Sequence, residues 1–284
     1  MNTGMKLRLD AEGLRSIAFV VADSLRWDSY CQARTPNLDR WCGPAERRYS
    51  YATWTQPSHA CLLGGLLPHG NAVGRPAAAT YADDYAFWAT VLGSDHSMPH
   101  PLYPEFCLAL MATRCGWVTI GRVAMPVLNE QSAFSRGFDD YQLSPRGSTL
   151  GTQCSSLPAT YGPRTFVFIN LGETHYPYAM PPGSVPHLAG AHGVISRSEP
   201  SVSPPRLNDH GWMKMLHRSQ VEAMERVDQG LCLLVERLPK PMLLLFTSDH
   251  GELFGEEGYF GHGPFVHPLL FEVPLAIGVI REAK

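Results

Sequence analysis

Three short apolar runs, each followed closely by ionisable side chains, constrain the fold of this chain more than any other feature. The runs are Ile17–Ala22, Thr165–Asn170 and Met242–Thr247. The polar residues that follow them are Asp23, Glu173, His175, Asp249 and His250. Short, β-branched and aliphatic runs that break into polar residues predict buried strands that end in loops.

Segments with helical features separate these strands. The helical candidates are Arg34–Trp41, Pro57–Leu67 and Leu216–Leu238, and two further strand candidates are Gly116–Gly121 and Val273–Ile280. Strands that alternate with helices predict an α/β sandwich. Because binding sites in α/β sheets lie at the carboxyl ends of the strands, we expect the polar clusters to converge on one edge of one sheet.

Composition narrows the functional class. The chain has 284 residues, of which 44% are hydrophobic and 17% charged, with a formal net charge of -3. It is too apolar to be disordered and not basic enough to favour a nucleic-acid partner. Pro181–His210 has no periodicity, and we interpret it as a lid or mobile loop beside the site, with plain disorder as the alternative.

The apolar stretches and the cysteines of the sequence indicate the cellular compartment. No apolar stretch is long enough to span a bilayer, and no apolar region precedes Ile17 as in a secretory signal. The seven cysteines are widely spaced and form no CxxC pair. We therefore expect buried free thiols in a cytoplasmic protein.

The strand-end residues include both carboxylates and imidazoles. Asp23, Asp249 and His250 are joined in this set by His175 and His262. Mixed Asp and His ligation suits zinc or manganese better than calcium or magnesium. Taken singly, such an Asp is more often a turn former and such a His more often a surface or core group, so the inference depends on their joint placement.

Thr55 stands next to the helix predicted over Pro57–Leu67. A hydroxyl at a helix N-terminus lies near free N–H groups and the positive end of the helix dipole. A metal bound to this oxygen would lower its pKa and make it a nucleophile. The alternative is that Thr55 only caps the helix.

With these residues identified, the chain from about Ile17 to Ile280 resembles the alkaline phosphatase/sulfatase superfamily. The matching segments are Asp23–Asp28, Thr35–Arg40, Thr55–Gly70, Arg136–Asp139, His175–Tyr178, Ser248–Gly263 and Val273–Leu275. The resemblance implies an alkaline phosphatase-like sandwich with a central, mostly parallel sheet and helices on both faces. It also implies one catalytic domain over residues 1–284.

The departures from the sulfatase pattern point to a branch of the superfamily. Thr55 replaces the Cys or Ser from which sulfatases make formylglycine, and His59 replaces an Arg of the signature. Ser24 replaces the second Asp of an acidic pair, and His250 replaces an Asn. These changes resemble the threonine-nucleophile branch of phosphodiesterases and phosphoethanolamine transferases.

The resemblance implies a role for each candidate residue. A first divalent metal, Zn preferred and Mn the alternative, is expected on Asp23, Thr55, Asp249 and His250. His175 and His262 are expected to bind a second ion or the substrate phosphate. Thr55 is the expected nucleophile, and His59 either orients the substrate, shuttles a proton or only packs within its helix. Glu173 and His267 are expected near the substrate or, with Glu252, as groups that orient the ligands.

The expected activity is cleavage of a small-molecule phosphate mono- or diester, by hydrolysis or transfer, through Thr55. Two alternatives remain open. One is a phosphonate or sulfate ester hydrolase of the same fold, and the other is a non-catalytic binding or scaffold member of the superfamily. The sequence leaves the oligomeric state undetermined.

Overall fold

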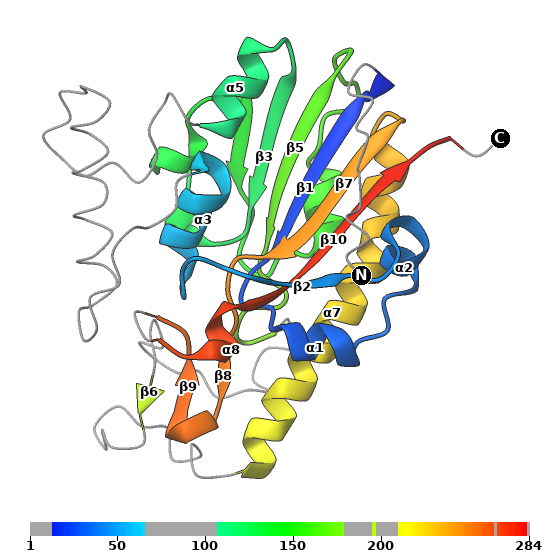
Figure 1. Cartoon of the computed structure of the whole chain (residues 1–284). Helices are drawn as coiled ribbons and strands as arrows, with labels where there is room; N and C mark the ends of the chain where they lie inside the picture. The colour runs from blue at the N-terminus through cyan, green and yellow to red at the C-terminus, as the bar shows by residue number, and fades with distance from the viewer. Residues whose placement is uncertain (1–12, 66–106, 179–194, 197–209, 264–265, 283–284) are drawn as a thin grey trace, which may run out of the picture.

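The computed structural model describes residues 13–65, 107–178, 195–196, 210–263 and 266–282. A seven-stranded sheet forms its centre, with the order β2-β10-β7-β1-β5-β3-β4 (Figure 1). The strands are β1 (Ser16–Ala22), β2 (Glu46–Tyr49), β3 (Val118–Val123), β4 (Asp140–Leu143), β5 (Thr165–Leu171), β7 (Met242–Ser248) and β10 (Glu272–Ile280). Neighbouring strands from β4 to β7 run parallel, whereas β10 is antiparallel to both β7 and β2. The predicted mostly parallel α/β sheet is confirmed.

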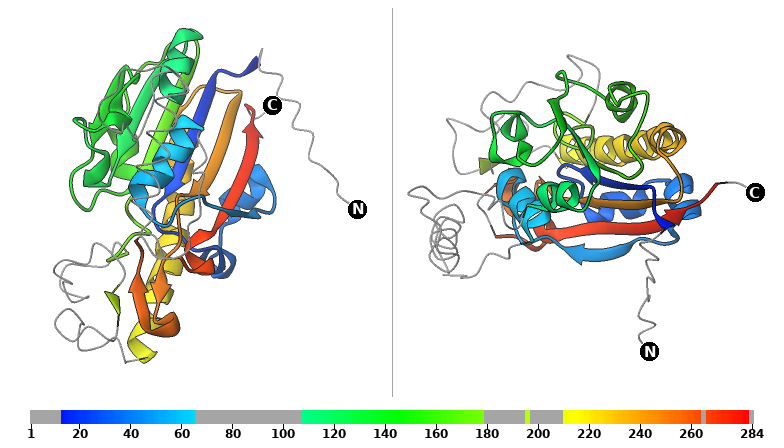
Figure 2. Two further views of the ribbon diagram at one scale, coloured as in Figure 1. Left: turned by 60° about the vertical axis from the view of Figure 1, so that its left-hand side comes forward. Right: turned by 90° about the horizontal axis from the view of Figure 1, so that it is seen from above.

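Helices cover both faces of this sheet, as expected. The helices are α1 (Trp27–Gln32), α2 (Pro36–Cys42), α3 (Thr55–Gly64), α5 (Leu108–Arg114), α6 (Leu150–Ser155), α7 (His210–Arg237) and α8 (Pro268–Phe271). One core cluster joins α1, α2, α6 and α7 to the sheet, and a second joins α3 and α5 to the opposite face. Figure 2 shows the long helix α7 on the face of the sheet opposite α3.

The central strands are buried on both faces, which explains their continuous apolar sequence. Ala18 and Val20 of β1 contribute to the core on the α7 side, while Phe19 and Val21 contribute to the core on the α3 side. Successive side chains of a strand point to opposite faces, so a strand covered on both sides needs apolar residues throughout.

A small antiparallel sheet lies beyond the carboxyl ends of the central strands (Figure 1). It has the order β6-β9-β8, with strands β6 (Ile195–Ser196), β8 (Leu253–Phe254) and β9 (Tyr259–Gly261). Three short 3₁₀ helices complete the described elements: η3 (Pro126–Leu128), η4 (Ala133–Ser135) and η5 (Glu256–Gly258). Phe254 and Phe260 of this sheet pack with Trp212 and Leu216 near the start of α7. The helix α7 thus connects the central core to the loops at the carboxyl edge.

Several element boundaries differ from the sequence predictions. α7 begins at His210 rather than Leu216, and α3 begins at Thr55 rather than Pro57. Gly65 ends α3 in a left-handed conformation with φ 65°. The predicted loop Pro181–His210 lies outside the described residues, except for β6 and the first residue of α7.

The seven cysteines are unpaired, as predicted, but most are not buried. Cys107 and Cys154 are buried, whereas Cys31 and Cys115 are exposed. Within the described part of the chain, no helix is long and apolar enough to cross a membrane.

Candidate metal and nucleophile site

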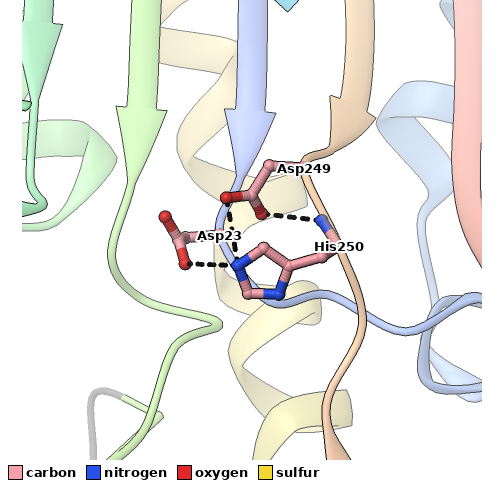
Figure 3. Close-up of side chains that lie close together, drawn as sticks. All are labelled: Asp23, Asp249 and His250. Atoms are coloured by element: carbon pink, nitrogen blue, oxygen red, sulfur yellow. Dashed lines mark hydrogen bonds and ion pairs between the residues drawn. The ribbon is translucent and has the colours of Figure 1, made fainter. Parts of the chain in front are cut away.

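The parallel register of the central strands brings the two aspartates together. Ala22 at the end of β1 pairs with Ser248 at the end of β7. The residues that follow, Asp23 and Asp249, therefore leave the same edge of the sheet side by side, and Figure 3 shows both carboxylates beside the His250 imidazole. Ligand atoms of these three residues all lie within 4.8 Å of one another, and the three side chains are fully buried. The predicted convergence of these two strand ends is confirmed.

A tight turn after β1 secures one oxygen of Asp249. Ser24 adopts a positive φ of 63°, which points its N–H at Asp249 Oδ1 at 3.0 Å. The N–H of His250 donates to the same oxygen at 2.9 Å. The other oxygen, Oδ2, is buried and has no hydrogen-bond partner among the described residues. A buried, unsatisfied carboxylate oxygen carries a large desolvation cost, which a bound cation would offset.

His250 presents its Nε2 atom to the two aspartates. Its Nδ1 lies 2.8 Å from the Gly251 carbonyl oxygen, so Nδ1 carries the proton of the neutral ring and Nε2 carries a lone pair. That Nε2 lies 3.3 Å from Asp249 Oδ2 and 3.8 Å from Asp23 Oδ1. Burial, together with the nearby His262, holds the pKa of His250 well below its usual range. The ring is thus neutral, as a metal ligand must be.

The residue after His250 must be glycine. A Cβ at Gly251 would lie 2.0 Å from the Leu269 carbonyl oxygen, and the Gly251 N–H donates to Leu270 O at 2.8 Å. This close approach anchors the loop that carries Asp249 and His250 against α8.

The carboxylates of Asp23 and Asp249 and the lone pair of His250 Nε2 lie close together in this cluster. Burial and the adjacent Asp23 carboxylate hold the pKa of Asp249 well above its usual range. Two carboxylates and an imidazole lone pair at such distances repel one another unless a positive charge lies between them. The donor set, two carboxylates and one neutral imidazole, therefore fits a divalent cation such as zinc or manganese.

Thr55 lies at the start of α3 with its hydroxyl directed at this cluster. Thr55 Oγ1 is 3.5 Å from Asp23 Oδ1 and 3.4 Å from His250 Nε2. The cap position belongs to Trp54, so the alternative that Thr55 only caps the helix is wrong. The hydroxyl instead belongs to the same group of atoms as the candidate metal ligands.

Two further imidazoles border the cluster. The ring centroid of His262 is 4.3 Å from that of His250 and 5.0 Å from that of His175. Nδ1 of His175 lies 2.8 Å from the Tyr176 carbonyl oxygen. His175 therefore resembles His250, because a backbone acceptor engages Nδ1 and leaves Nε2 for a ligand.

Glu252 holds His262 in the same way. Glu252 Oε1 lies 2.8 Å from His262 Nδ1, and Glu252 Oε2 accepts a hydrogen bond of 2.8 Å from the Tyr178 hydroxyl. Burial alone would lower the pKa of His262, but the hydrogen bond and charge of Glu252 raise it above the usual value. The structure thus places Glu252 where a ligand-orienting group was predicted.

His59 is wholly buried among the site residues, with 0% exposure. Its Nδ1 lies 2.8 Å from the Thr55 carbonyl oxygen, and its Nε2 lies 3.4 Å from Nδ2 of Asn170. Burial lowers the pKa of His59, so the ring is neutral. Both ring nitrogens are occupied by protein groups.

The side chains of Glu173 and His267 accept hydrogen bonds from backbone N–H groups at the starts of two short helices. Glu173 Oε2 accepts from the Leu150 N–H at 3.1 Å at the start of α6, and burial raises the pKa of this carboxyl to about 7. His267 Nδ1 accepts from the Leu269 N–H at 3.2 Å at the start of α8. These contacts do not test the predicted place of Glu173 and His267 beside the substrate, which stays a prediction.

Two amide side chains at the site, those of Asn170 and Gln220, were not predicted from the sequence. Asn170, near the end of β5, donates to Asp23 Oδ2 at 3.0 Å. Gln220 of α7 donates to the carbonyl oxygens of Ser24 at 2.9 Å and Thr174 at 3.0 Å, which joins the loops after β1 and β5. Each is a polar residue among apolar buried positions of its strand or helix, and this break in the pattern could have identified it from the sequence.

Comparisons with known proteins bear on the family and the fold of this chain. The family model described as Sulfatase matches residues 15–277. No curated protein matches the chain.

Solved structures show the same fold at low sequence identity. The C-terminal periplasmic domain of EcEptC from Escherichia coli, in complex with Zn, is 16% identical with a TM-score of 0.53, covering 94% of this chain and 73% of that one. The periplasmic domain of phosphoethanolamine transferase EptC from Campylobacter jejuni is 12% identical with a TM-score of 0.58, covering 93% and 79%. BT1596, a 2-O GAG sulfatase, is 12% identical with a TM-score of 0.58, covering 94% and 64%.

Proposed function

We propose, on the premise that this chain belongs to the sulfatase family within the alkaline phosphatase superfamily, that it cleaves phosphate esters with Thr55 as nucleophile. The observation that carries the proposal is the position of Thr55 Oγ1, 3.4 Å from His250 Nε2 and 3.5 Å from Asp23 Oδ1. A hydroxyl in that position shares its surroundings with the atoms suited to hold a divalent cation.

Asp23, Asp249 and His250 would hold the cation together with the Thr55 hydroxyl oxygen. A divalent cation there would lower the pKa of the hydroxyl and stabilise negative charge on the phosphoryl group. The unpaired Oδ2 of Asp249 and the lone pair of His250 Nε2 are the two donors that most need such a partner. Zinc is our first choice and manganese the second, for one ion or two.

The proposed reaction is a double displacement. The Thr55 hydroxyl loses its proton to solvent and its oxygen attacks phosphorus, the ester oxygen of the substrate leaves and takes up a proton from solvent, and the phosphoryl group remains on Thr55. Water or an acceptor alcohol then attacks the same phosphorus and restores the Thr55 hydroxyl. The Nε2 atoms of His175 and His262 would bind phosphoryl oxygens or a second ion, since the Nδ1 atom of each ring is engaged by the protein.

Preorganised electrostatics would supply most of the rate enhancement. Phosphate esters are among the slowest substrates to hydrolyse without a catalyst. The side chains that form this site are fixed by hydrogen bonds to backbone or buried groups, so little reorganisation is needed as charge develops.

The test is turnover of a panel of nitrophenyl esters: phosphate monoester, phosphate diester, phosphonate ester and sulfate ester. We expect the purified, zinc- or manganese-loaded chain to prefer a phosphate ester. Thr55→Ala should lower kcat by on the order of 10³-fold or more, while Thr152→Ala, at an exposed position of α6, should leave kcat unchanged. Mass spectrometry of the quenched reaction should find one phosphoryl group on the peptide that contains Thr55.

Three outcomes would overturn the proposal. Full turnover by Thr55→Ala would remove the nucleophile assignment, and faster cleavage of the phosphonate or sulfate ester would reassign the substrate class. A metal-loaded chain that cleaves none of the four esters would favour the scaffold alternative.

A further inference from the structure

Asn170 is held in one orientation by the backbone next to it. Its side-chain oxygen accepts hydrogen bonds from the N–H groups of Ala124 at 3.2 Å and Met125 at 3.1 Å, just after β3. Both lone pairs of Oδ1 are therefore occupied. The amide cannot flip without facing its NH₂ group toward two N–H donors.

The fixed amide determines where its two hydrogens point. One goes to Asp23 Oδ2 at 3.0 Å, and the other faces His59 Nε2 at 3.4 Å. Since Asn170 Nδ2 can only donate, His59 Nε2 must accept, and the proton of the ring must sit on Nδ1. That Nδ1 donates to the Thr55 carbonyl oxygen at 2.8 Å.

These contacts make one continuous hydrogen-bonded chain. It runs from the backbone after β3 through Asn170 to the Asp23 carboxylate, and through His59 to the backbone of Thr55. Asn170 and His59 are both 0% exposed, so solvent does not compete for these hydrogen bonds.

We propose that Asn170 and His59 are positioning residues that fix the Asp23 carboxylate and Thr55 relative to each other. Asn170 engages Oδ2 of Asp23 and so turns Oδ1 toward the Thr55 hydroxyl. His59 transmits the same constraint to the first turn of α3. The inference rests on the proposed function for the roles of Asp23 and Thr55, and it removes His59 from proton transfer.

The arrangement explains why an amide, and not a carboxylate, stands at the end of β5. An aspartate at position 170 would set an oxygen against Asp23 Oδ2 and a second acceptor against His59 Nε2. His59 could meet that change by carrying a proton on Nε2, either in place of the proton on Nδ1 or in addition to it.

The first experiment is therefore ¹⁵N NMR of the histidine side chains in the full chain, with the His59 resonances assigned from their loss in His59→Gln. We expect a neutral Nδ1–H tautomer for His59 in the natural chain and a proton on His59 Nε2 in Asn170→Asp. The matched change Asn129→Asp, in a surface turn, should leave the tautomer unchanged. An Nε2–H tautomer in the natural chain would overturn the inference, and so would an unprotonated His59 Nε2 in a folded Asn170→Asp.

The second experiment measures zinc affinity by competition with a chelating dye in the absence of substrate, so turnover plays no part. Asn170→Ala should weaken zinc binding about 10- to 100-fold, the usual cost of losing a group that orients a ligand. Unchanged affinity would overturn the role assigned to Asn170. In the natural background we also expect Asn170→Ala to lower kcat with little change in KM, because the residue orients reacting groups and does not touch substrate.

The experiments distinguish failure of the proposed function from failure of the positioning roles of Asn170 and His59. A chain that bound no zinc would count against the proposed function, while the NMR comparison would still decide whether Asn170 sets the His59 tautomer. A chain that bound zinc and cleaved phosphate esters equally well with and without Asn170 would keep the function and reject the positioning pair.

Discussion

Asp249 Oδ2 lies 3.3 Å from His250 Nε2, although neither atom carries a proton to share when the ring is neutral and the carboxyl ionised. No described residue donates a hydrogen bond to that oxygen. Such a pair raises the free energy of the folded chain until a cation joins it.

Replacing Asp249 with Asn should remove the response of the chain to metal. In the natural chain, zinc at 100 times its Kd should add about 2.7 kcal/mol to the free energy of unfolding and raise Tm by about 5 °C or more. Asn can still accept from the Ser24 and His250 N–H groups, and its NH₂ group can donate to His250 Nε2. Metal-free Asp249→Asn should thus be at least as stable as the natural chain but show no rise in Tm with zinc.

Differential scanning calorimetry with and without zinc measures both effects. The matched change Asp39→Asn, on the exposed side of α2, should retain the full rise in Tm. A full rise in Asp249→Asn would show that the cation binds elsewhere.

Replacing Glu252 with Gln should weaken the site without unfolding it. Gln keeps an acceptor for His262 Nδ1, and its NH₂ group can donate to the Tyr178 hydroxyl oxygen. The lost negative charge makes His262 less basic, so metal affinity or turnover should fall about 10- to 100-fold.

Metal titration and steady-state kinetics on the same preparation test this expectation. Tyr178→Phe removes only the hydrogen bond to Glu252 Oε2 and should have a smaller effect. Equal losses in the two variants would mean that geometry, and not the charge of Glu252, controls His262.

Glu256 should contribute stability that depends on pH. Its Oε1 lies 2.6 Å from Nη1 of Arg26, which is only 4% exposed. Burial would raise the pKa of Glu256, but the Arg26 charge and hydrogen bond outweigh burial and hold the pKa below its usual value. Because the folded-state pKa is the lower one, this stability is complete above the unfolded pKa and is lost as pH falls through the folded pKa.

Urea unfolding of Glu256→Gln between pH 7 and pH 3 measures this contribution. At pH 7 the variant should be less stable than the natural chain by about 1 kcal/mol. The difference should shrink below about pH 4.5. The neighbouring exposed Glu257→Gln should show no such trend, and a pH-independent loss in Glu256→Gln would mean that packing, and not charge, accounts for it.

The sequence predicted the central strands because burial on both faces leaves a continuous apolar run. It missed β2, whose residues Glu46–Tyr49 are all exposed at the edge of the sheet. An edge strand without a buried face has no apolar pattern, and only its pairing with β10 defines it.

The positions of the candidate metal ligands Asp23 and Asp249 were also predictable from the apolar runs. Asp23 and Asp249 follow strands that are neighbours in register, so the end of each run fixes the position of the next side chain. The surroundings of His59 were not predictable, because they depend on Asn170 at a distance of 111 positions. A histidine in a helix gives no sign of which tautomer a distant amide imposes on it.

The separation of the site residues along the chain also has a consequence for biosynthesis. Ser24 Oγ lies 3.4 Å from His262 Nδ1 across 238 positions. During translation, the loop after β1 leaves the ribosome long before the residues that complete its surroundings. Contacts so distant in sequence form late and slowly. The cluster of Asp23, Asp249 and His250 can therefore assemble only in chains whose synthesis has passed His250, and in shorter chains Asp23 lacks these two neighbours.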